Sequence, residues 1–256
     1  MTEAQLTQAL AAFDSAAAAW ERVITADVPD LDVSANWPPF NGCGGAGHLT
    51  AIDDIVIDVS VAKNDGRGGV LGSAGYCART GTLPRAGIMT FDSEDVDAML
   101  AGDLFGRVVM HEMGHVLGIG TMWQYAGYLD VSGDDDPDPR YTGPAAVAEW
   151  NTLSGNSDAG VPIENSGGSG TKWSHWRESR FHSELMTGWI SLGSSPLSRV
   201  SIASLADLGY QVDLSQADPY VLESALLGTL APRASAHSET EAGFVLLTPE
   251  GPIGND

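Results

Sequence analysis

Two histidines and a glutamate fall within five consecutive residues, at His111, Glu112 and His115. In a helix, residues i and i+4 project from the same face one turn apart, so both imidazoles can reach one metal ion. Glu112 lies one step further round the helix than His111, where its carboxylate would accept a proton instead of binding the ion. The pattern H-E-x-x-H therefore predicts zinc-assisted hydrolysis with Glu112 as the general base.

The neighbouring residues help to separate a real site from a chance match. Such a string arises by chance in about one chain in a hundred, and a chance match is usually a solvated helix face. Here apolar side chains precede the motif at Phe105 and residues 108–110 and follow it at residues 116–117. Burying two histidines and a glutamate in so apolar a helix is costly unless they bind something. The context favours the metal site.

A catalytic zinc ion usually has three protein ligands and one open position, so a third ligand is needed. In metzincin metalloproteases the pattern continues as H-E-x-x-H-x-x-G-x-x-H, and the glycine lets the chain turn so that the last histidine reaches the metal. Gly118 matches this glycine, but Thr121 stands where the third histidine would be. The other histidines of the chain are His48, His175, His182 and His237. The first lies in a glycine-rich segment and the last in a polar tail, which leaves His175 and His182 as candidates.

The context of His175 resembles the leishmanolysin family of metzincins. That family inserts a long segment before its third histidine, which lies in a Ser-His-Trp context, and a methionine follows eleven residues later in the Met-turn. Here His175 lies 60 residues after His115, between Ser174 and Trp176. Met186 follows His175 by 11 residues, inside a Glu-Leu-Met-Thr-Gly string that is similar to the family's Met-turn. The resemblance covers roughly residues 10–222.

The resemblance implies a set of site residues. The implied zinc ligands are His111, His115 and His175. Glu112 would be the general base, and Met186 would pack beneath the metal without binding it. His182 stays open as an alternative third ligand, although the spacing to the Met-turn favours His175.

Hydrophobic spacing predicts the elements that must hold these residues. The expected helices are at residues 4–24, 104–117, 144–153 and 199–208. The expected strands are at residues 52–61 and 87–91, with a glycine-rich loop at 65–75 between them. Residues 87–91 are the expected edge strand above the cleft, since metzincins bind peptides by adding them to such a strand; an ordinary sheet strand is the alternative.

The expected fold is α+β, a metzincin-like metalloprotease of two lobes. A mixed twisted sheet and the active-site helix would form the N-terminal lobe, at about residues 1–120. A loop-rich C-terminal lobe with a helix would follow at about residues 121–232. Together they would form one catalytic domain, residues 1–232, and residues 233–256 would be a polar tail.

Cysteine usage bears on the compartment. The chain has two cysteines, Cys43 and Cys77, both in glycine-rich segments and neither in a C-x-x-C pair. One disulfide between them is the preferred interpretation and indicates an oxidising, extracellular location. Two buried free thiols are the alternative.

Residues 1–20 have no basic n-region of a signal peptide, so the route of export is open.

Charge limits the class of partner. With 12 basic and 34 acidic residues in 256, the net charge is −22, which repels nucleic acid and anionic membranes. The sequence contains no run of 18 apolar residues, so it predicts no transmembrane helix. The charge argues against nucleic acid and membranes as partners. We expect a monomer, and the H-E-x-x-H motif points to protein or peptide substrates.

An acidic stretch rich in glycine and proline could bind calcium, which takes six to eight oxygen ligands. Its carboxylates are Asp130, Asp134, Asp135, Asp136 and Asp138. Their spacing differs from that of an EF-hand, and a solvated charge run is the alternative.

The sequence thus predicts a secreted zinc endopeptidase. A catalytically silent zinc-stabilised binding or adhesion module is one alternative, which the presence of Glu112 disfavours because such a module needs no general base. A metal-dependent hydrolase of non-peptide bonds is another, which the Met-turn resemblance disfavours.

Overall fold

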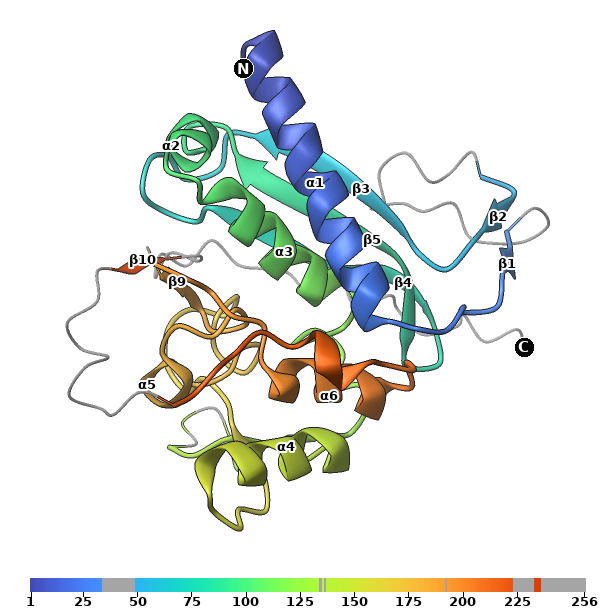
Figure 1. Ribbon diagram of the computed structural model, residues 1–256, viewed down its shortest axis with the longest axis vertical. Coiled ribbons are helices and arrows are strands. Elements are labelled where there is room, and N and C mark those ends of the chain that lie inside the picture. The colour runs from blue at the N-terminus through green and yellow to red at the C-terminus, as the bar shows by residue number, and fades with distance from the viewer. Residues whose placement is uncertain (34–48, 134, 136, 192, 223–232, 236–256) are drawn as a thin grey trace.

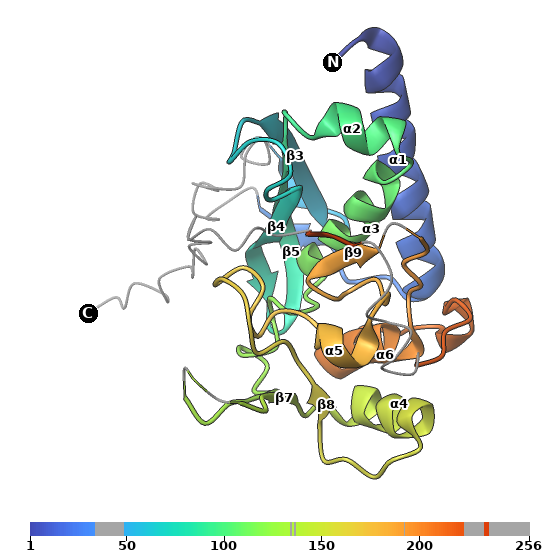
Figure 2. The same ribbon diagram turned by 90° about the vertical axis from the view of Figure 1, so that its left-hand side faces the viewer.

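The computed structural model describes residues 1–33, 49–133, 135, 137–191, 193–222 and 233–235. The N-terminal half contains a three-stranded sheet, with α1, α2 and α3 on one of its faces (Figures 1 and 2). In the C-terminal half, α4 and α6 pack beside irregular chain and very short strands. The α+β class predicted from the sequence is confirmed.

The sheet has the order β3–β5–β4. Strand β3 (Val56–Ala62) is parallel to β5 (Leu83–Asp92), and β4 (Gly72–Thr80) is antiparallel to it. The prediction that residues 87–91 form the edge strand was wrong, because this segment lies in β5 between two partners. Within the described residues, β3 and β4 each pair on one side only, so these two are the edge strands of the sheet.

The predicted loop at residues 65–75 was also partly wrong, because β4 already begins at Gly72. Its sequence, GSAGYCART, has few large apolar side chains, so the usual strand pattern is weak. Hydrogen bonding to β5 supplies the strand conformation instead.

Helix α1 (Glu3–Val23) begins in a capping box, in which Thr2 and Gln5 each accept a hydrogen bond from the other's backbone N–H. Its buried face packs on α3 (Phe105–Val116), and Trp20 Nε1 donates to the carbonyl of Met110 at 3.2 Å. The short helix α2 (Val96–Ala101) connects the sheet to α3. Thus α3 is held between the sheet and α1.

The C-terminal half contains α4 (Pro144–Ser154), α5 (Glu178–Phe181), α6 (Arg199–Leu208) and the 3₁₀ helix η2 (Leu214–Gln216). Its strands are β6 (Leu129–Asp130), β7 (Arg140–Tyr141), β8 (Val161–Pro162), β9 (Trp189–Ser191) and β10 (Arg233–Ser235). A further pair, β1 (Leu31–Asp32) and β2 (Ala51–Ile52), flanks the N-terminal sheet. The carboxylate of Asp207 in α6 caps α4 by accepting from the N–H groups of Ala145 and Ala146.

One hydrophobic cluster joins the two halves. It includes Trp20, Phe91 and Val109 on the N-terminal side and Trp176 and Leu205 on the C-terminal side. Such a continuous core fits the expected single domain, while the division into lobes stays a prediction. The first three residues of the expected polar tail form β10, which pairs with β9. Among the described residues, no helix combines the length and apolar character needed to cross a bilayer.

Candidate metal centre

Helix α3 carries both histidines of the motif in a buried part of the protein. His111 and His115 are both buried, and the helix has apolar neighbours on most sides. A Cβ atom on Gly114 would lie 2.8 Å from Met186 Sδ. A glycine between the two histidines therefore lets Met186 pack directly against the helix. Its place beneath a bound metal, which the resemblance implied, stays a prediction.

His175 completes a group of three imidazoles. It lies in a turn of the C-terminal half, and its Nε2 atom is 3.0 Å from that of His115 and 3.3 Å from that of His111. The Nε2 atoms of His111 and His115 are also 3.0 Å apart. Ligands at 2.0–2.1 Å from a tetrahedral zinc ion lie about 3.3 Å from one another. The three nitrogens thus have nearly the spacing of three corners of a zinc site.

The other ring nitrogens fix how these imidazoles are protonated. The Nδ1 atoms of His111, His115 and His175 lie 2.7, 2.8 and 2.9 Å from the carbonyls of Leu185, Ile119 and Thr171. A carbonyl only accepts hydrogen bonds, so each Nδ1 carries the proton and each neutral ring has its lone pair on Nε2. Three lone pairs then face one another in a buried space, an arrangement that a cation would stabilise. Burial also lowers the pKa of His115 to about 4, which keeps this ring neutral.

Glu112 lies beside this group on α3. It is fully buried, and both carboxylate oxygens lack a hydrogen-bond partner among the described residues. Burial raises the pKa of Glu112 to about 8. The carboxylate lies against the start of edge strand β4, since a Cβ atom on Gly72 would be 2.9 Å from Glu112 Oε1. A buried carboxylate without partners is costly, which is typical of a group kept for chemistry.

The raised pKa of Glu112 predicts a pH effect on the metal-free protein. The pKa of Glu112 is about 8 in the folded protein and 4.5 as the reference value. The folded protein is therefore not penalised by this group below pH 4.5, and its free energy of unfolding falls as the pH rises from 4.5 through 8. His115 acts in the opposite sense, because its lowered pKa costs stability in acid. We therefore expect metal-free wild type to lose up to about 1.4 kcal/mol per pH unit relative to Glu112→Gln over this window. Urea unfolding of both proteins across the window checks this, and a pH-independent difference would contradict it.

Two glycines after α3 bring the third histidine close. Gly118 and Gly120 have φ values of +115° and +79°, which L side chains rarely adopt. A Cβ atom on Gly120 would lie only 2.0 Å from the carbonyl oxygen of Ser174, next to His175. Thr121, which stands where many metzincins have a histidine, donates instead to the carbonyl of His115 at 2.7 Å.

This close approach predicts a large effect of Gly120→Ala. The new methyl group would collide with backbone, and overpacking costs about 1–3 kcal/mol in addition to about 1–2 kcal/mol for the left-handed conformation. Gly127→Ala is the matched control, because Gly127 has φ +77° but open space around it. Denaturant unfolding should show a much larger loss of stability in Gly120→Ala. Equal losses in the two variants would contradict the contact.

The alternative third ligand, His182, is not in this group. His182 is buried at the end of α5 with φ +51°, and it is not part of the cluster of His111, His115 and His175. His48 and His237 lie outside the described residues. So does Cys43, while Cys77 lies on β4, so the predicted disulfide stays a prediction.

The predicted calcium stretch receives no support. Asp134 and Asp136 lie outside the described residues, and the Asp138 carboxylate forms ion pairs with Arg140 and Arg177 at 2.6 and 2.7 Å. Those contacts hold the pKa of Asp138 below its usual value despite the opposing effect of burial. Another carboxylate group, formed by Asp27, Asp53 and Asp54, is exposed, and exposed acidic groups of this kind are common without an ion.

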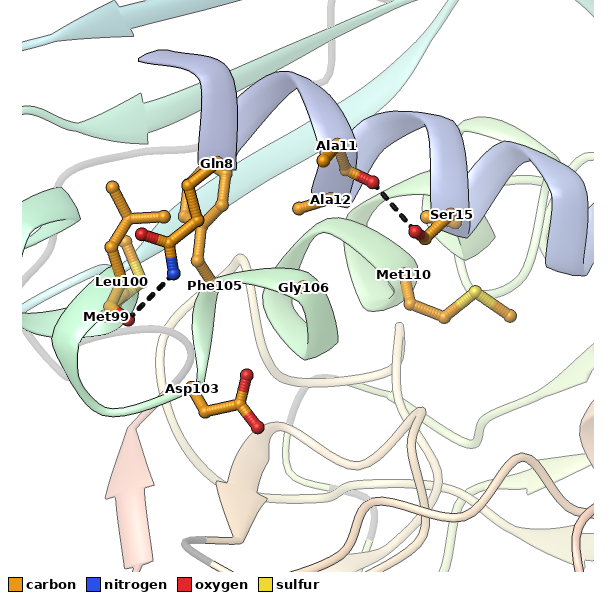
Figure 3. A pocket seen from close by; sticks show the side chains of 11 residues that line it. Gln8, Ala11, Ala12, Ser15, Met99, Leu100, Asp103, Phe105, Gly106 and Met110 are labelled. Carbon is orange, nitrogen blue, oxygen red and sulfur yellow. Dashed lines mark hydrogen bonds between the residues drawn. The ribbon is translucent and has the colours of Figure 1, made fainter. Parts of the chain in front are cut away.

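A separate pocket of about 390 Å³ lies on another side of α3, between this helix, α1 and α2 (Figure 3). Gln8 and Ser15 of α1 line it together with Asp103 and Met110. No member of the histidine group lines this pocket, so it does not belong to the metal centre.

The sequence reasoning missed several residues that support the centre. The carbonyls of Leu185, Ile119 and Thr171 orient the rings, and any residue type could supply them. Glu184 accepts hydrogen bonds from the N–H of Met186 inside the Met-turn and from the N–H of Ser198 at the start of α6. The only sign of this role in the sequence was the position of Glu184 in the Glu-Leu-Met-Thr-Gly string.

Three convergent imidazoles on and beside an H-E-x-x-H helix define the metallopeptidase class of site. The family model for leishmanolysin matches residues 48–226, and the chain belongs to the leishmanolysin family. A leishmanolysin homolog from Crithidia fasciculata is 30% identical over 171 residues, which is 63% of this chain and 25% of that protein. The chain thus spans about a quarter of the length of this relative. The resemblance noted around His175 and Met186 is confirmed at the level of the family.

Proposed function

We propose that this protein is a zinc-dependent endopeptidase. The observation that carries the proposal is the convergence of three imidazole Nε2 atoms within 3.3 Å of one another, each with its Nδ1 held by a backbone carbonyl. His111, His115 and His175 would hold the zinc ion. Membership of the leishmanolysin family supports a zinc metallopeptidase, and cleavage of internal peptide bonds is the finer step of the proposal.

Zinc at this position would lower the pKa of water to about 7 and polarise the carbonyl of the scissile bond. Glu112 accepts a proton from the attacking water and then delivers it to the leaving amine. The pKa of about 8 belongs to the metal-free protein, and a cation bound beside the carboxyl group would lower it, which favours the charged form that a base needs. Neither carboxylate oxygen has a hydrogen-bond partner in the part of the chain that the structure describes, so both are available for this work.

The edge strand β4 offers a place for the peptide. Its first residue, Gly72, contacts Glu112, so main chain bound along this edge would pass close to the base. An extended peptide that adds to a sheet edge gains main-chain hydrogen bonds, which depend little on its sequence. We therefore assign to β4 the role first expected of residues 87–91.

A silent zinc-stabilised module fits the site less well. Zinc bound for stability needs the three histidines but gains nothing from a buried Glu112 carboxylate, which has no partner among the described residues. The proposal also includes a single catalytic domain formed by residues 1–232, Met186 as a packing residue, and secretion with a Cys43–Cys77 disulfide.

Metal dependence tests the function. The purified protein should degrade casein or gelatin, lose this activity with a chelator, and regain it when zinc is added back. Calcium alone should not restore cleavage. Cleavage that survives complete removal of zinc, checked by metal analysis, would contradict the proposal.

A further inference from the structure

The Met-turn contains a buried carboxylate that the proposed chemistry does not use. Glu184 is 1% exposed, and its carboxylate accepts four hydrogen bonds. Oε1 accepts from the N–H and hydroxyl of Ser198, at 3.0 and 2.7 Å, and from the hydroxyl of Ser201. Oε2 accepts from the N–H of Met186. These four hydrogen bonds connect the Met-turn to the start of α6 through one buried side chain.

The Met-turn residues Leu185 and Met186 contact the metal centre in two places. The carbonyl of Leu185 accepts the hydrogen bond from His111 Nδ1 at 2.7 Å. The carbonyl of Met186 accepts from the N–H of Trp176, next to His175, at 3.0 Å. A shift of this short segment would therefore move His111 and His175 together.

A second route runs through Ser201. Its single hydroxyl proton is donated to Glu184, so the oxygen is free to accept from Trp176 Nε1, at 2.7 Å. Glu184 thus fixes the orientation of the hydroxyl that holds the indole beside His175. Both the main chain and the side chain of Trp176 depend on the same carboxylate.

We propose that Glu184 is a positioning residue of the metal centre, which holds the Met-turn so that His111 and His175 converge with His115. The inference rests on the proposed zinc function. It predicts that removing hydrogen bonds to Glu184 lowers the affinity for zinc even when the protein stays folded.

Glu184→Gln tests this with little change of volume. The amide oxygen can keep the three donors at the Oε1 position, while the NH₂ group then faces the N–H of Met186 and breaks that one link. Asp207→Asn is the matched control. Asp207 also lies on α6 and also accepts backbone N–H groups, but those belong to α4 and not to the Met-turn.

Three readouts separate positioning from general stability. They are the zinc dissociation constant from chelator competition, the absorption spectrum of the cobalt-substituted protein, and near-ultraviolet circular dichroism of the metal-free protein. We expect folded Glu184→Gln to bind zinc about 10-fold or more weakly and to show altered cobalt bands, whereas Asp207→Asn keeps zinc affinity within about twofold. Wild-type zinc affinity and cobalt bands in folded Glu184→Gln would overturn the inference.

If Glu184→Gln does not fold without metal, Ser201→Ala decides. This change removes one donor to Glu184 and the acceptor for Trp176 Nε1, so weaker zinc binding and altered cobalt bands are expected. Wild-type values there would overturn the inference. A wild-type protein that binds no zinc would overturn the proposed function, and this inference with it.

Discussion

Replacing Glu112 with glutamine is expected to abolish peptide hydrolysis while leaving zinc in place. The three imidazoles do not depend on this side chain, because their Nδ1 atoms are held by backbone carbonyls. Glutamine has nearly the same shape but cannot accept the proton of water. Loss of a general base costs about 10²–10⁴-fold in rate.

The measurement combines metal analysis with the rate of casein cleavage for wild type and Glu112→Gln. One zinc per chain in both proteins, with the rate falling to background in the variant, is the expected outcome. A zinc-loaded variant that cleaves as fast as wild type would assign the base to another residue. Gln8→Ala, at the separate pocket, is a suitable control variant with unchanged expected activity.

Replacing His175 with alanine is expected to remove zinc, whereas His182→Ala should retain it. His175 Nε2 lies 3.0 Å from His115 Nε2, while His182 is absent from the histidine group. Loss of a direct ligand should exceed the about 10–100-fold loss of affinity that follows removal of an outer partner. Zinc titration of both folded variants tests this assignment.

His182→Ala controls for stability, since both histidines are buried in the same half of the protein. Zinc lost only from His182→Ala would overturn the assignment of the third ligand. Zinc retained by both variants would show that two histidines of α3 suffice for binding.

The metal helix was predictable because its chemistry is local. His111 and His115 are one helical turn apart, and a helix of known period places their rings together. His175 could not be found from spacing, since it lies 60 residues after His115 and reaches the site through tertiary contacts. The family resemblance supplied it.

Other features depend on pairing that the sequence hides. Strand β4 lacks apolar alternation, and its place at the edge of the sheet follows from its hydrogen bonds to β5. The carbonyl that orients His111 belongs to Leu185, where the side chain gives no hint of the role. The close approach of Gly120 to Ser174 likewise arises only in the folded chain.

The central claim, a zinc endopeptidase, is tested most directly by the products formed from a peptide blocked at both ends. Zinc-loaded wild type should yield fragments cut at internal bonds, identified by mass spectrometry, and chelator-treated protein should yield none. A wild-type protein that holds one zinc per chain at its histidine centre and leaves such peptides and casein intact would contradict the claim.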